Sequence, residues 1–321
     1  MSGGGGRVTV VVPCYNAAAF LADTLRSFDE QTLGGFEVLF VDDGSTDGTL
    51  GMVTDYARER PGTRVLHRPD NRGVCRTLNE GVAAVSTEFT VVFAADDVML
   101  PNLMADALAA IDRSSERCAA VAFAHYAGTA EAEIRSGPDG SPEVRRPPAG
   151  ADGLEPPGLL PLQLVANHLA GVALFRTDVL RGLGYDERSH IEDWDMWCRI
   201  VAAHPIAVAD EPVFIYRDSP MSLDKRLKQS GQRSVAGAAV RAKFCGDGGP
   251  IDDAILRRTK MELHVLIAAG LRREARTVMR LLAEGGLRAR FPVERAVMAV
   301  PTPVVRCLAR LAQRARRLRS R

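Results

Sequence analysis

The sequence has no long hydrophobic run and almost no net charge. No stretch reaches the roughly 18 consecutive apolar residues of a membrane-spanning helix, and Met1–Gly6 is glycine-rich, unlike the apolar core of a signal peptide. The 41 basic and 40 acidic residues leave a formal charge of +1, so the overall charge favours no particular partner. We therefore expect a cytoplasmic protein, and we expect it not to bind nucleic acid, because no recognition motif accompanies that near-neutral charge.

The sequence also lacks paired cysteines. Its six cysteines are scattered without a C-x-x-C pair: Cys14, Cys75, Cys118, Cys198, Cys245 and Cys307. This pattern is typical of reduced thiols and argues against a disulfide framework or a zinc site. With 321 residues the chain can bury a large core in one domain or two.

What the sequence does contain is a regular alternation of apolar runs and amphipathic segments. We expect strands over Val8–Val12, Glu37–Val41, Arg64–His67, Thr90–Ala94 and Ala119–Ala124, and helices over Ala17–Glu30, from Ser45 or Thr46 to about Arg60, Val74–Val85 and Pro101–Ile111. We expect Asn16 to cap the first helix, and Ser45 or Thr46 the second. This alternation over about 125 residues predicts an α/β fold with a Rossmann-like, mainly parallel sheet and helices on both faces.

The pattern changes in the second part of the chain. Between Gly128 and Pro161 the sequence is rich in glycine, proline and charge, for which a flexible excursion and a lid remain alternatives. A helix is expected at Glu192–Ala203, and from Lys225 onward the chain reads as helices. The tail Val304–Arg321 places apolar residues among arginines. A solvated final helix and a helix lying on the inner face of an anionic membrane both fit that tail.

Carboxylates follow two of the expected strands. Val41-Asp42-Asp43-Gly44-Ser45-Thr46-Asp47 comes directly after one apolar run, and Asp96-Asp97 closes another. Because ligands bind at the carboxyl ends of strands in open α/β sheets, these carboxylates should gather at a binding edge. Such a group suits a divalent cation, and the cation suits a diphosphate. Turn formation and helix capping explain Ser45–Asp47 as well, but they leave Asp42 and Asp43 without a role.

Further segments surround these carboxylates in a fixed order. They are Pro13-Cys14-Tyr15-Asn16, the acidic turn, Asn71-Arg72-Gly73-Val74-Cys75-Arg76-Thr77-Leu78-Asn79-Glu80-Gly81, Asp96-Asp97 followed by Pro101, and Glu192-Asp193-Trp194-Asp195-Met196-Trp197. Together they resemble the motifs of family 2 glycosyltransferases of the GT-A fold, over about Val8 to Arg217. The resemblance implies inverting transfer of a sugar from a nucleoside-diphosphate donor, with UDP-sugars the family's most frequent donors, to an acceptor hydroxyl. It also implies Mn²⁺ or Mg²⁺ as cofactor.

The resemblance implies roles for the residues that would hold the nucleotide. Pro13 and Tyr15 would line the base, Asn16 belongs to the same segment, and Asp43 would accept a hydrogen bond from the base. The ring of Tyr15 has the flat face that stacking needs. Arg76 matches an arginine near the diphosphate, with an ordinary surface arginine as the alternative.

The carboxylates Asp96 and Asp97 match those that bind the ribose and the metal in the family. Asp97 is assigned to the metal, and Asp96 to the nucleotide, the metal or both. Many relatives carry Asp-x-Asp-Asp at this point, whereas this chain has Ala94-Ala95-Asp96-Asp97. The missing outer acid leaves the division of contacts open.

Asp193 matches the catalytic base of the family, and Glu192 lies beside it. Inverting transfer needs a carboxylate that takes the proton of the acceptor hydroxyl. Favourable interaction of first-turn acids with the helix dipole is the alternative, and it is compatible with catalysis. For Trp194 and Trp197, which are one helical turn apart, core packing competes with sugar stacking. The segment Gly171–Arg176 matches one that packs beneath the acceptor pocket.

Two other functions are weighed against transfer. A nucleotidyltransferase would carry a basic, glycine-rich loop after the first strand, where this chain has Pro13–Asn16. A catalytically silent nucleotide-sugar-binding protein is favoured by Ala94 and opposed by Asp97 and Asp193. The expected organisation is a disordered N-terminus at residues 1–7, a glycosyltransferase domain at 8–220 (nucleotide half 8–126, flexible loop 127–161, acceptor half 162–220), and a helical region with a basic tail at 221–321.

Overall fold

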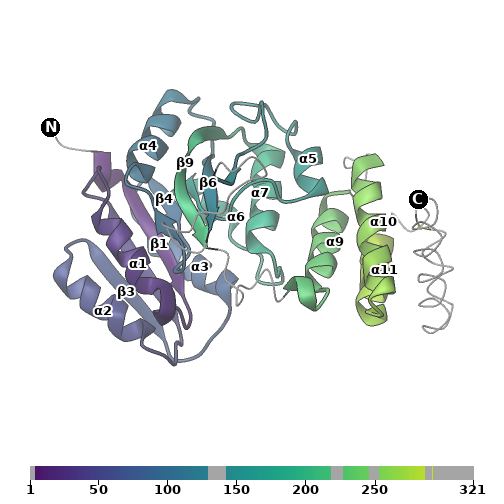
Figure 1. The fold of residues 1–321 in the computed structure, drawn as a ribbon. Helices are drawn as coiled ribbons and strands as arrows, with labels where there is room; N and C mark the ends of the chain where they lie inside the picture. The colour runs from purple at the N-terminus through teal and green to yellow at the C-terminus, as the bar shows by residue number, and fades with distance from the viewer. Residues whose placement is uncertain (1–3, 129–141, 218–226, 246–252, 286–290, 292–321) are drawn as a thin grey trace. The chain divides into compact units, whose positions relative to one another are not determined.

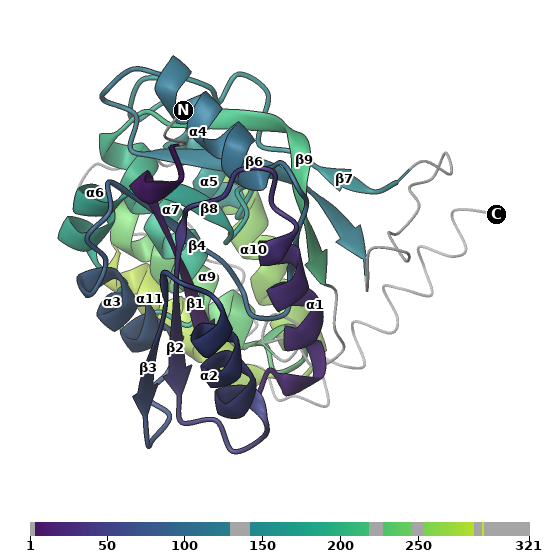
Figure 2. The same ribbon diagram turned by 90° about the vertical axis from the view of Figure 1, so that its left-hand side faces the viewer.

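A computed structural model of the chain describes residues 4–128, 142–217, 227–245, 253–285 and 291 (Figures 1 and 2). The basic tail Val304–Arg321 lies outside the described residues, and the loop expected at 127–161 is described only in part. Within the described part of the chain, no helix is both long and apolar enough to cross a membrane. Residues Gly4–Arg7, expected to belong to a disordered terminus, form a short 3-10 helix, η1, which Arg7 ties to Glu88 and Asp112.

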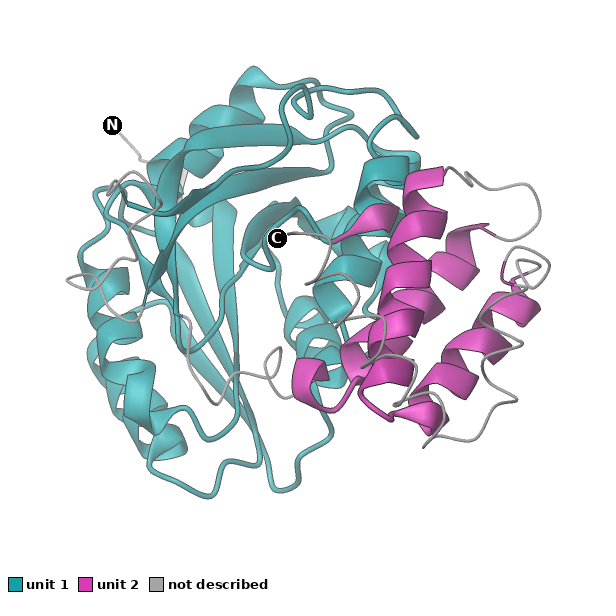
Figure 3. Cartoon of the chain, turned by 45° about the vertical axis from the view of Figure 1, so that its right-hand side comes forward, with its two compact units in different colours: residues 1–163, 167–219 teal, residues 164–166, 220–321 magenta. Residues whose placement is uncertain are grey.

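The chain divides into two compact units, coloured separately in Figure 3. The first comprises residues 1–163 and 167–219, and the second residues 164–166 and 220–321. The assignment of a nucleotide half and an acceptor half to parts of the first unit stays a prediction.

The first unit is built on one mixed sheet. Its described strands are β1 (Val8–Cys14), β2 (Glu37–Asp43), β3 (Thr63–Arg68), β4 (Phe89–Val92), β5 (Val98–Met99), β6 (Ala120–Gly128), β7 (Val144–Arg145), β8 (Ala173–Arg176) and β9 (Ala207–Arg217). Their order is β3-β2-β1-β4-β8-β6-β9-β5, and β7 pairs with β6. The strands β3, β2, β1 and β4 are mutually parallel, whereas β8 runs antiparallel to both of its neighbours. The predicted α/β fold is confirmed.

Helices cover both faces of this sheet, with α1 and α2 on one side and α3 and α6 on the other (Figure 2). The described helices of the first unit are α1 (Ala18–Asp29), α2 (Thr49–Glu59), α3 (Val74–Ala83), α4 (Leu103–Arg113), α5 (Leu160–Val165, which crosses into the second unit), α6 (Thr177–Leu183) and α7 (Glu192–Ala203). The second unit contains α9 (Gln232–Cys245), α10 (Asp253–Ala268) and α11 (Arg272–Glu284). Within the described residues after Lys225, the predicted helices are therefore present.

Side-chain alternation along the strands sorts the core into two layers. Val10, Val12 and Phe40 belong to the buried cluster that also contains residues of α1, α2 and α4. The intervening Val11 faces α3, and a Cβ added to Gly81 would lie 2.6 Å from its Cγ1 atom. Gly81 therefore lets α3 approach the sheet closely, because any side chain there would collide with the strand.

The interior of the second unit contains a fully buried arginine, Arg241. Arg241 is 0% exposed and pairs with Glu262 at 2.7 Å. Its guanidinium also donates to the carbonyls of Leu164 and Val165, at 2.9 and 3.0 Å. A buried charge needs such partners to offset its desolvation, so this cluster fixes α9 against the end of α5.

Candidate functional site

The acidic turn and the loop after β1 are tied together by reciprocal hydrogen bonds. Asn16 has a positive φ of 51°, its Oδ1 accepts from Thr46 N at 2.8 Å, and its own N–H donates to Ser45 Oγ at 3.0 Å. The predicted cap of α1 by Asn16 is wrong, because the Asn16 side chain is used by the acidic turn instead. Asp47 Oδ2 accepts from Ala18 N, at the start of α1.

The same aspartate also satisfies the start of the second helix. Asp47 Oδ1 accepts from the backbone N–H of Thr49 at 2.9 Å, and α2 begins there. Capping by Ser45 or Thr46 is therefore wrong, and α2 starts later than expected. Burial opposes ionisation of Asp47, but the hydrogen bonds from Thr49 and Ala18 outweigh it and lower its pKa.

Asp43 lies at the end of β2 and is only 3% exposed. Its Oδ1 accepts from Arg72 N at 2.9 Å and pairs with the Arg68 guanidinium at 2.8 Å. Its Oδ2 accepts from Gly73 N at 2.8 Å. Since each carboxylate oxygen can accept about two hydrogen bonds, Oδ2 retains one acceptor position. A nucleotide base could donate a hydrogen bond to that position on Oδ2. The role of Asp43 in binding the base stays a prediction.

The adjacent Gly44 explains how the 71–73 loop comes so close. Gly44 has a φ of 72°, and a Cβ on it would lie 2.8 Å from Asn71 N. Only glycine tolerates both the left-handed backbone and this approach.

Asp42 is also buried, with 0% exposure. Its Oδ2 accepts from Ser45 N at 3.2 Å and lies 3.0 Å from His67 Nδ1. Its Oδ1 has no hydrogen-bond partner among the described residues. Because that atom is shielded from solvent as well, Asp42 shapes the turn from within and is not placed to meet a ligand.

The other predicted nucleotide contacts are partly or fully exposed. Tyr15 follows β1 and is 51% exposed, which leaves its ring open for stacking. Pro13 is half-buried in β1, opposite Val41. Arg76, on α3, pairs with Glu187 at 3.0 Å, and both side chains are exposed. Their roles in binding stay predictions.

Asp96 and Asp97 lie just beyond β4, where the end of β9 holds them. Asp97 is 2% exposed, and its Oδ1 accepts from Arg217 N at 2.9 Å. The Arg217 guanidinium donates to Asp96 O at 2.7 Å and to Asp23 Oδ2 at 3.0 Å. Among the described residues, no hydrogen bond reaches Oδ2 of Asp97.

Both carboxyl groups are shifted towards the neutral form. Burial raises the pKa of Asp97 well above its usual range, and the charge of Asp96 raises it further. Burial also raises the pKa of Asp96, against the opposing charge of Arg217. Two neighbouring carboxyls that repel each other in a buried position are stabilised by a cation.

These two residues fit a divalent metal that is completed by its substrate. The described residues contain no group of three or more His, Cys, Asp or Glu side chains that could hold a metal without help. Mg²⁺ is commonly bound by one or two carboxylates together with substrate phosphate oxygens. Asp97, with Asp96 beside it, provides that partial set.

The pairing of β8 with β4 brings Asp193 to the same edge of the sheet. Val92 of β4 lies opposite Ala173 of antiparallel β8, so the residues after β4 and those before β8 share one end. Gly171 lies there, and a Cβ on it would be 3.6 Å from that of Asp193. Asp193 Oδ2 accepts from Asn167 Nδ2 at 2.8 Å, and its Oδ1 accepts from Trp194 N at 2.7 Å.

Glu192 and Asp193 open α7, where first-turn acids interact favourably with the helix dipole. Burial raises the pKa of Glu192 to about 7, and the charge of Asp193 adds to the shift. The hydrogen bonds donated to Asp193 favour its ionised form instead. The two neighbours therefore occupy different environments, as is common where one carboxylate acts as an acid or base.

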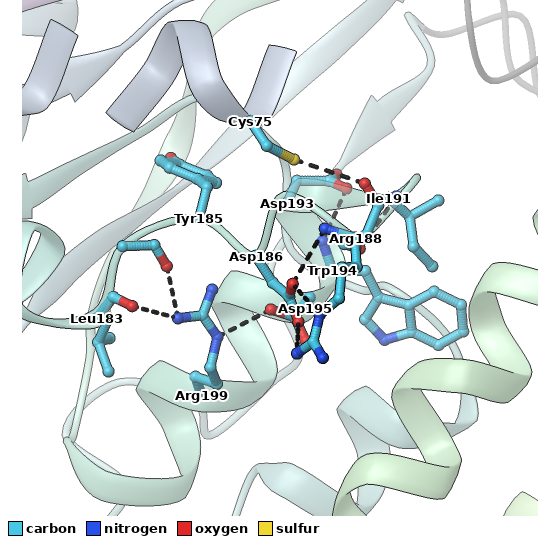
Figure 4. Close-up of polar contacts among 12 residues, drawn as sticks. Cys75, Leu183, Tyr185, Asp186, Arg188, Ile191, Asp193, Trp194, Asp195 and Arg199 are labelled. Atoms are coloured by element: carbon cyan, nitrogen blue, oxygen red, sulfur yellow. Dashed lines mark hydrogen bonds and ion pairs between the residues drawn. The ribbon is translucent and has the colours of Figure 1, made fainter. Parts of the chain in front are cut away.

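Polar contacts connect the residues around Asp193 (Figure 4). Arg199 joins Asp195, at 2.8 Å, to the carbonyls of Leu183 and Gly184, so the first turn of α7 is fixed to the end of α6. Trp197 is 1% and Trp194 4% exposed. Core packing is thus the role of both tryptophans, and sugar stacking is wrong for them.

Some residues of this site escaped sequence reasoning. Asn167 and Gln163 connect to Asp193, and Arg217 holds the aspartates after β4, but none of them lies in a segment that we singled out. Their sequence signal was weak because a single Asn, Gln or Arg has many ordinary surface roles.

Known proteins resemble this chain in sequence over its first part. Residues 9–145 match the family model described as Glycosyl transferase family 2. A PGL/p-HBAD biosynthesis glycosyltransferase of Mycobacterium bovis is 35% identical over 89 residues, 28% of this chain and 35% of that protein. The chain thus matches only about a third of the length of the curated relatives.

Solved structures share the fold across almost the whole chain. TarS 1-349 of S. aureus in complex with UDP has a TM-score of 0.58 and 19% identity, covering 95% of this chain and 92% of that one. Mannosyltransferase PcManGT of Pyrobaculum calidifontis, in complex with GDP-Man and Mn²⁺, has a TM-score of 0.56 and 18% identity, covering 95% and 87%. These similarities agree with the resemblance drawn from the motifs: residues 9–145 match glycosyltransferase family 2, and the fold is the GT-A fold of the solved glycosyltransferases.

Proposed function

We propose that this protein is an inverting glycosyltransferase that moves a sugar from a nucleoside-diphosphate donor to an acceptor hydroxyl. The observation that carries the proposal is the placement of two unlike carboxylate sites at one edge of the sheet. One is the pair of half-buried Asp96 and buried Asp97, whose pKa values are raised. The other is Asp193, which accepts hydrogen bonds on both of its oxygens.

The donor nucleotide would occupy the ends of β1, β2 and β4. Exposed Tyr15 offers its ring to the base, and Asp43 Oδ2 retains one acceptor position for a base N–H. Asp97, with Asp96, would hold a divalent Mn²⁺ or Mg²⁺. When bound, this metal supplies positive charge that stabilises the departing nucleoside diphosphate.

Asp193 acts as the general base. It takes the proton of the acceptor hydroxyl while that oxygen attacks the anomeric carbon of the sugar. The new glycosidic bond forms as the bond from the anomeric carbon to the diphosphate oxygen breaks, which inverts the configuration. Glu192 lies beside the base, and its raised pKa, about 7, keeps much of it neutral near neutral pH.

The donor base and sugar are open within this proposal. TarS was solved with UDP and with UDP-GlcNAc, and PcManGT with GDP-Man. We favour a UDP-sugar, because such donors are the commonest in the resembling family. We also propose that the enzyme is cytoplasmic and that its basic tail, Val304–Arg321, contacts the inner face of the membrane.

A thermal-shift screen of nucleoside diphosphates, with and without Mn²⁺, tests the donor site. A ligand that binds the folded state raises the melting temperature, so stabilisation should require nucleotide and metal together. No response to any nucleotide would contradict the proposal.

A catalytically silent binding protein is the second candidate, and Ala94 in the place of an acid favours it. Such a protein would give the same thermal shift but would neither transfer nor hydrolyse any donor. Release of nucleoside diphosphate from a panel of donors, measured with an acceptor mixture, separates the two functions.

A further inference from the structure

A fully buried glutamine lies two hydrogen bonds away from Asp193. Gln163 is 0% exposed, and its Nε2 donates to Asn167 Oδ1 at 2.6 Å. Asn167 Nδ2 in turn donates to Asp193 Oδ2 at 2.8 Å. The two amides therefore form a chain that ends on the carboxylate.

The direction of this chain is set by a group that can only donate. The backbone N–H of His168 donates to Gln163 Oε1 at 3.1 Å, so the other end of that amide must be its NH₂ group. This NH₂ group faces Asn167, so the Asn167 atom that accepts its hydrogen bond must be the carbonyl oxygen Oδ1. Asn167 is then left with its NH₂ towards Asp193, and a flip of either amide would place two donors or two acceptors together.

The chain closes into a ring through Trp194. Its indole N–H donates to Gln163 O at 2.6 Å, and its backbone N–H donates to Asp193 Oδ1 at 2.7 Å. Gln163 is thus held at both its backbone and its side chain. Asp193 is held at both oxygens by donors that belong to that ring.

An amide NH₂ can only donate, and its hydrogen bond to Asp193 Oδ2 is stronger when the carboxylate is ionised. Among the described residues, ionisable groups near this corner include Glu192, on the same helix, and Tyr185, whose pKa is influenced by both acids. Cys75, on α3, is influenced by Glu192. Repulsion from Glu192 opposes a charge on Asp193, and the two hydrogen bonds donated to Asp193 favour that charge.

We propose that Asn167, oriented by Gln163, is a positioning residue that keeps Asp193 ionised and aimed at the acceptor hydroxyl. Only the part of this inference that concerns the acceptor hydroxyl rests on the proposed function. The orientation and ionisation of Asp193 can be measured without any turnover.

The test combines the isosteric variant Asn167→Asp, the truncation Asn167→Ala and the variant Gln163→Glu. The titration of Asp193 is followed by carbon NMR of aspartate-labelled protein, with its resonance identified by its loss in Asp193→Asn. Removing a donor to the ionised form should raise the titration midpoint by about one pH unit in Asn167→Ala. Asn167→Asp should raise it further, since it replaces the donor by a like charge.

Kinetics on the same proteins measure the consequence. We expect the acidic limb of the pH profile of kcat to move upward by the same amount, and kcat at neutral pH to fall about 10-fold in Asn167→Ala, with the nucleotide Kd unchanged. Gln163→Glu should give a smaller shift in the same direction, because Asn167 loses its orienting donor. Asn102→Asp, an exposed amide on the segment before α4, is the matched control and should leave every readout unchanged.

The outcomes separate this inference from the proposed function. An unchanged Asp193 midpoint in both Asn167 variants overturns the inference, whatever the activity. A shifted midpoint with transfer that survives Asp193→Asn supports the inference and instead contradicts the assignment of Asp193 as the base. Variants that only melt earlier, with midpoint and pH profile unmoved, would show that the amide pair serves stability alone.

Discussion

The acidic turn and the pair Asp96-Asp97 look alike in sequence, but the structure uses them in opposite ways. In the turn, Asp43 accepts from two backbone N–H groups and an arginine, and Asp47 serves the starts of two helices. Beyond β4, Asp97 has one backbone donor, and its pKa is raised well above the usual range. Asp43 and Asp47 of the turn are thus held by several donors of the protein itself, whereas the pair Asp96-Asp97 leaves its charge in need of a cation.

This difference separates a scaffold from a reactive site. A carboxylate that is fully hydrogen-bonded contributes to stability and holds a loop in place. A buried carboxylate with too few donors costs free energy in the folded state and is kept where a ligand offsets that cost. Asp193 differs from both, since it accepts a hydrogen bond on each oxygen, from Asn167 and from Trp194.

The largest expected effect comes from Asp193→Asn. The amide cannot take a proton from the acceptor, so we expect kcat to fall by about 10²–10⁴-fold. Donor binding and melting temperature should change little, because the shape is preserved. Transfer assays with nucleotide affinity measured in parallel check this, and full activity of the variant would remove Asp193 from the chemistry.

Asp97→Asn should come next and should separate binding from stability. We expect stabilisation by nucleotide plus Mn²⁺ to disappear and activity to fall by about 10²-fold, since charge stabilisation of the leaving group is lost. The folded-state pKa of Asp97 is raised, so its stabilising contribution is present at low pH and is lost as pH rises. At neutral pH the neutral amide should therefore raise the melting temperature of the ligand-free protein. A lower melting temperature would contradict the comparison.

In the turn, the matched change should have the opposite sign. Asp43→Asn removes one of the two carboxylate partners of the buried Arg68, leaving Glu80 at 2.9 Å. It also removes one acceptor from the 72–73 backbone, so we expect a loss of about 1–3 kcal/mol in unfolding free energy. Urea denaturation of this variant beside Asp97→Asn tests the contrast directly. Equal changes in both variants would mean that the two acidic sites do not differ in kind.

The fold was largely predictable because residues 8–126 alternate apolar runs with amphipathic segments. Strand β1 and the helices α1 and α3 lie within a few residues of their predicted ranges. The strands β5 and β9 were not predicted. Ala207–Arg217 mixes acidic, proline and apolar residues, and its pairing with β6 contains register shifts. Its apolar residues therefore do not alternate regularly with polar ones, as they would in an easily predicted strand.

The site was predictable only where a motif carried the information. Asp97 and Asp193 were found by resemblance, and the structure brings both to one edge through the antiparallel β8, which no periodicity revealed. The cap assignments failed for a physical reason. Asn16 and Ser45 are residue types that often cap helices, but here they form hydrogen bonds between the loop after β1 and the acidic turn instead.

The smallest expected effect concerns Glu192, whose pKa is raised although it lies beside the hydrogen-bonded Asp193. Burial raises its pKa from 4.5 to about 7, so the folded state binds more protons than the unfolded state between those values. Its contribution to stability is complete below about pH 4.5 and is lost as pH rises through about 7. We therefore expect the melting temperature of the wild type to fall, relative to Glu192→Gln, by a few degrees over this window. The exposed Glu116→Gln should run parallel to the wild type. If Glu192→Gln did so too, Glu192 would titrate like a surface acid, and the contrast with Asp193 beside it would not hold.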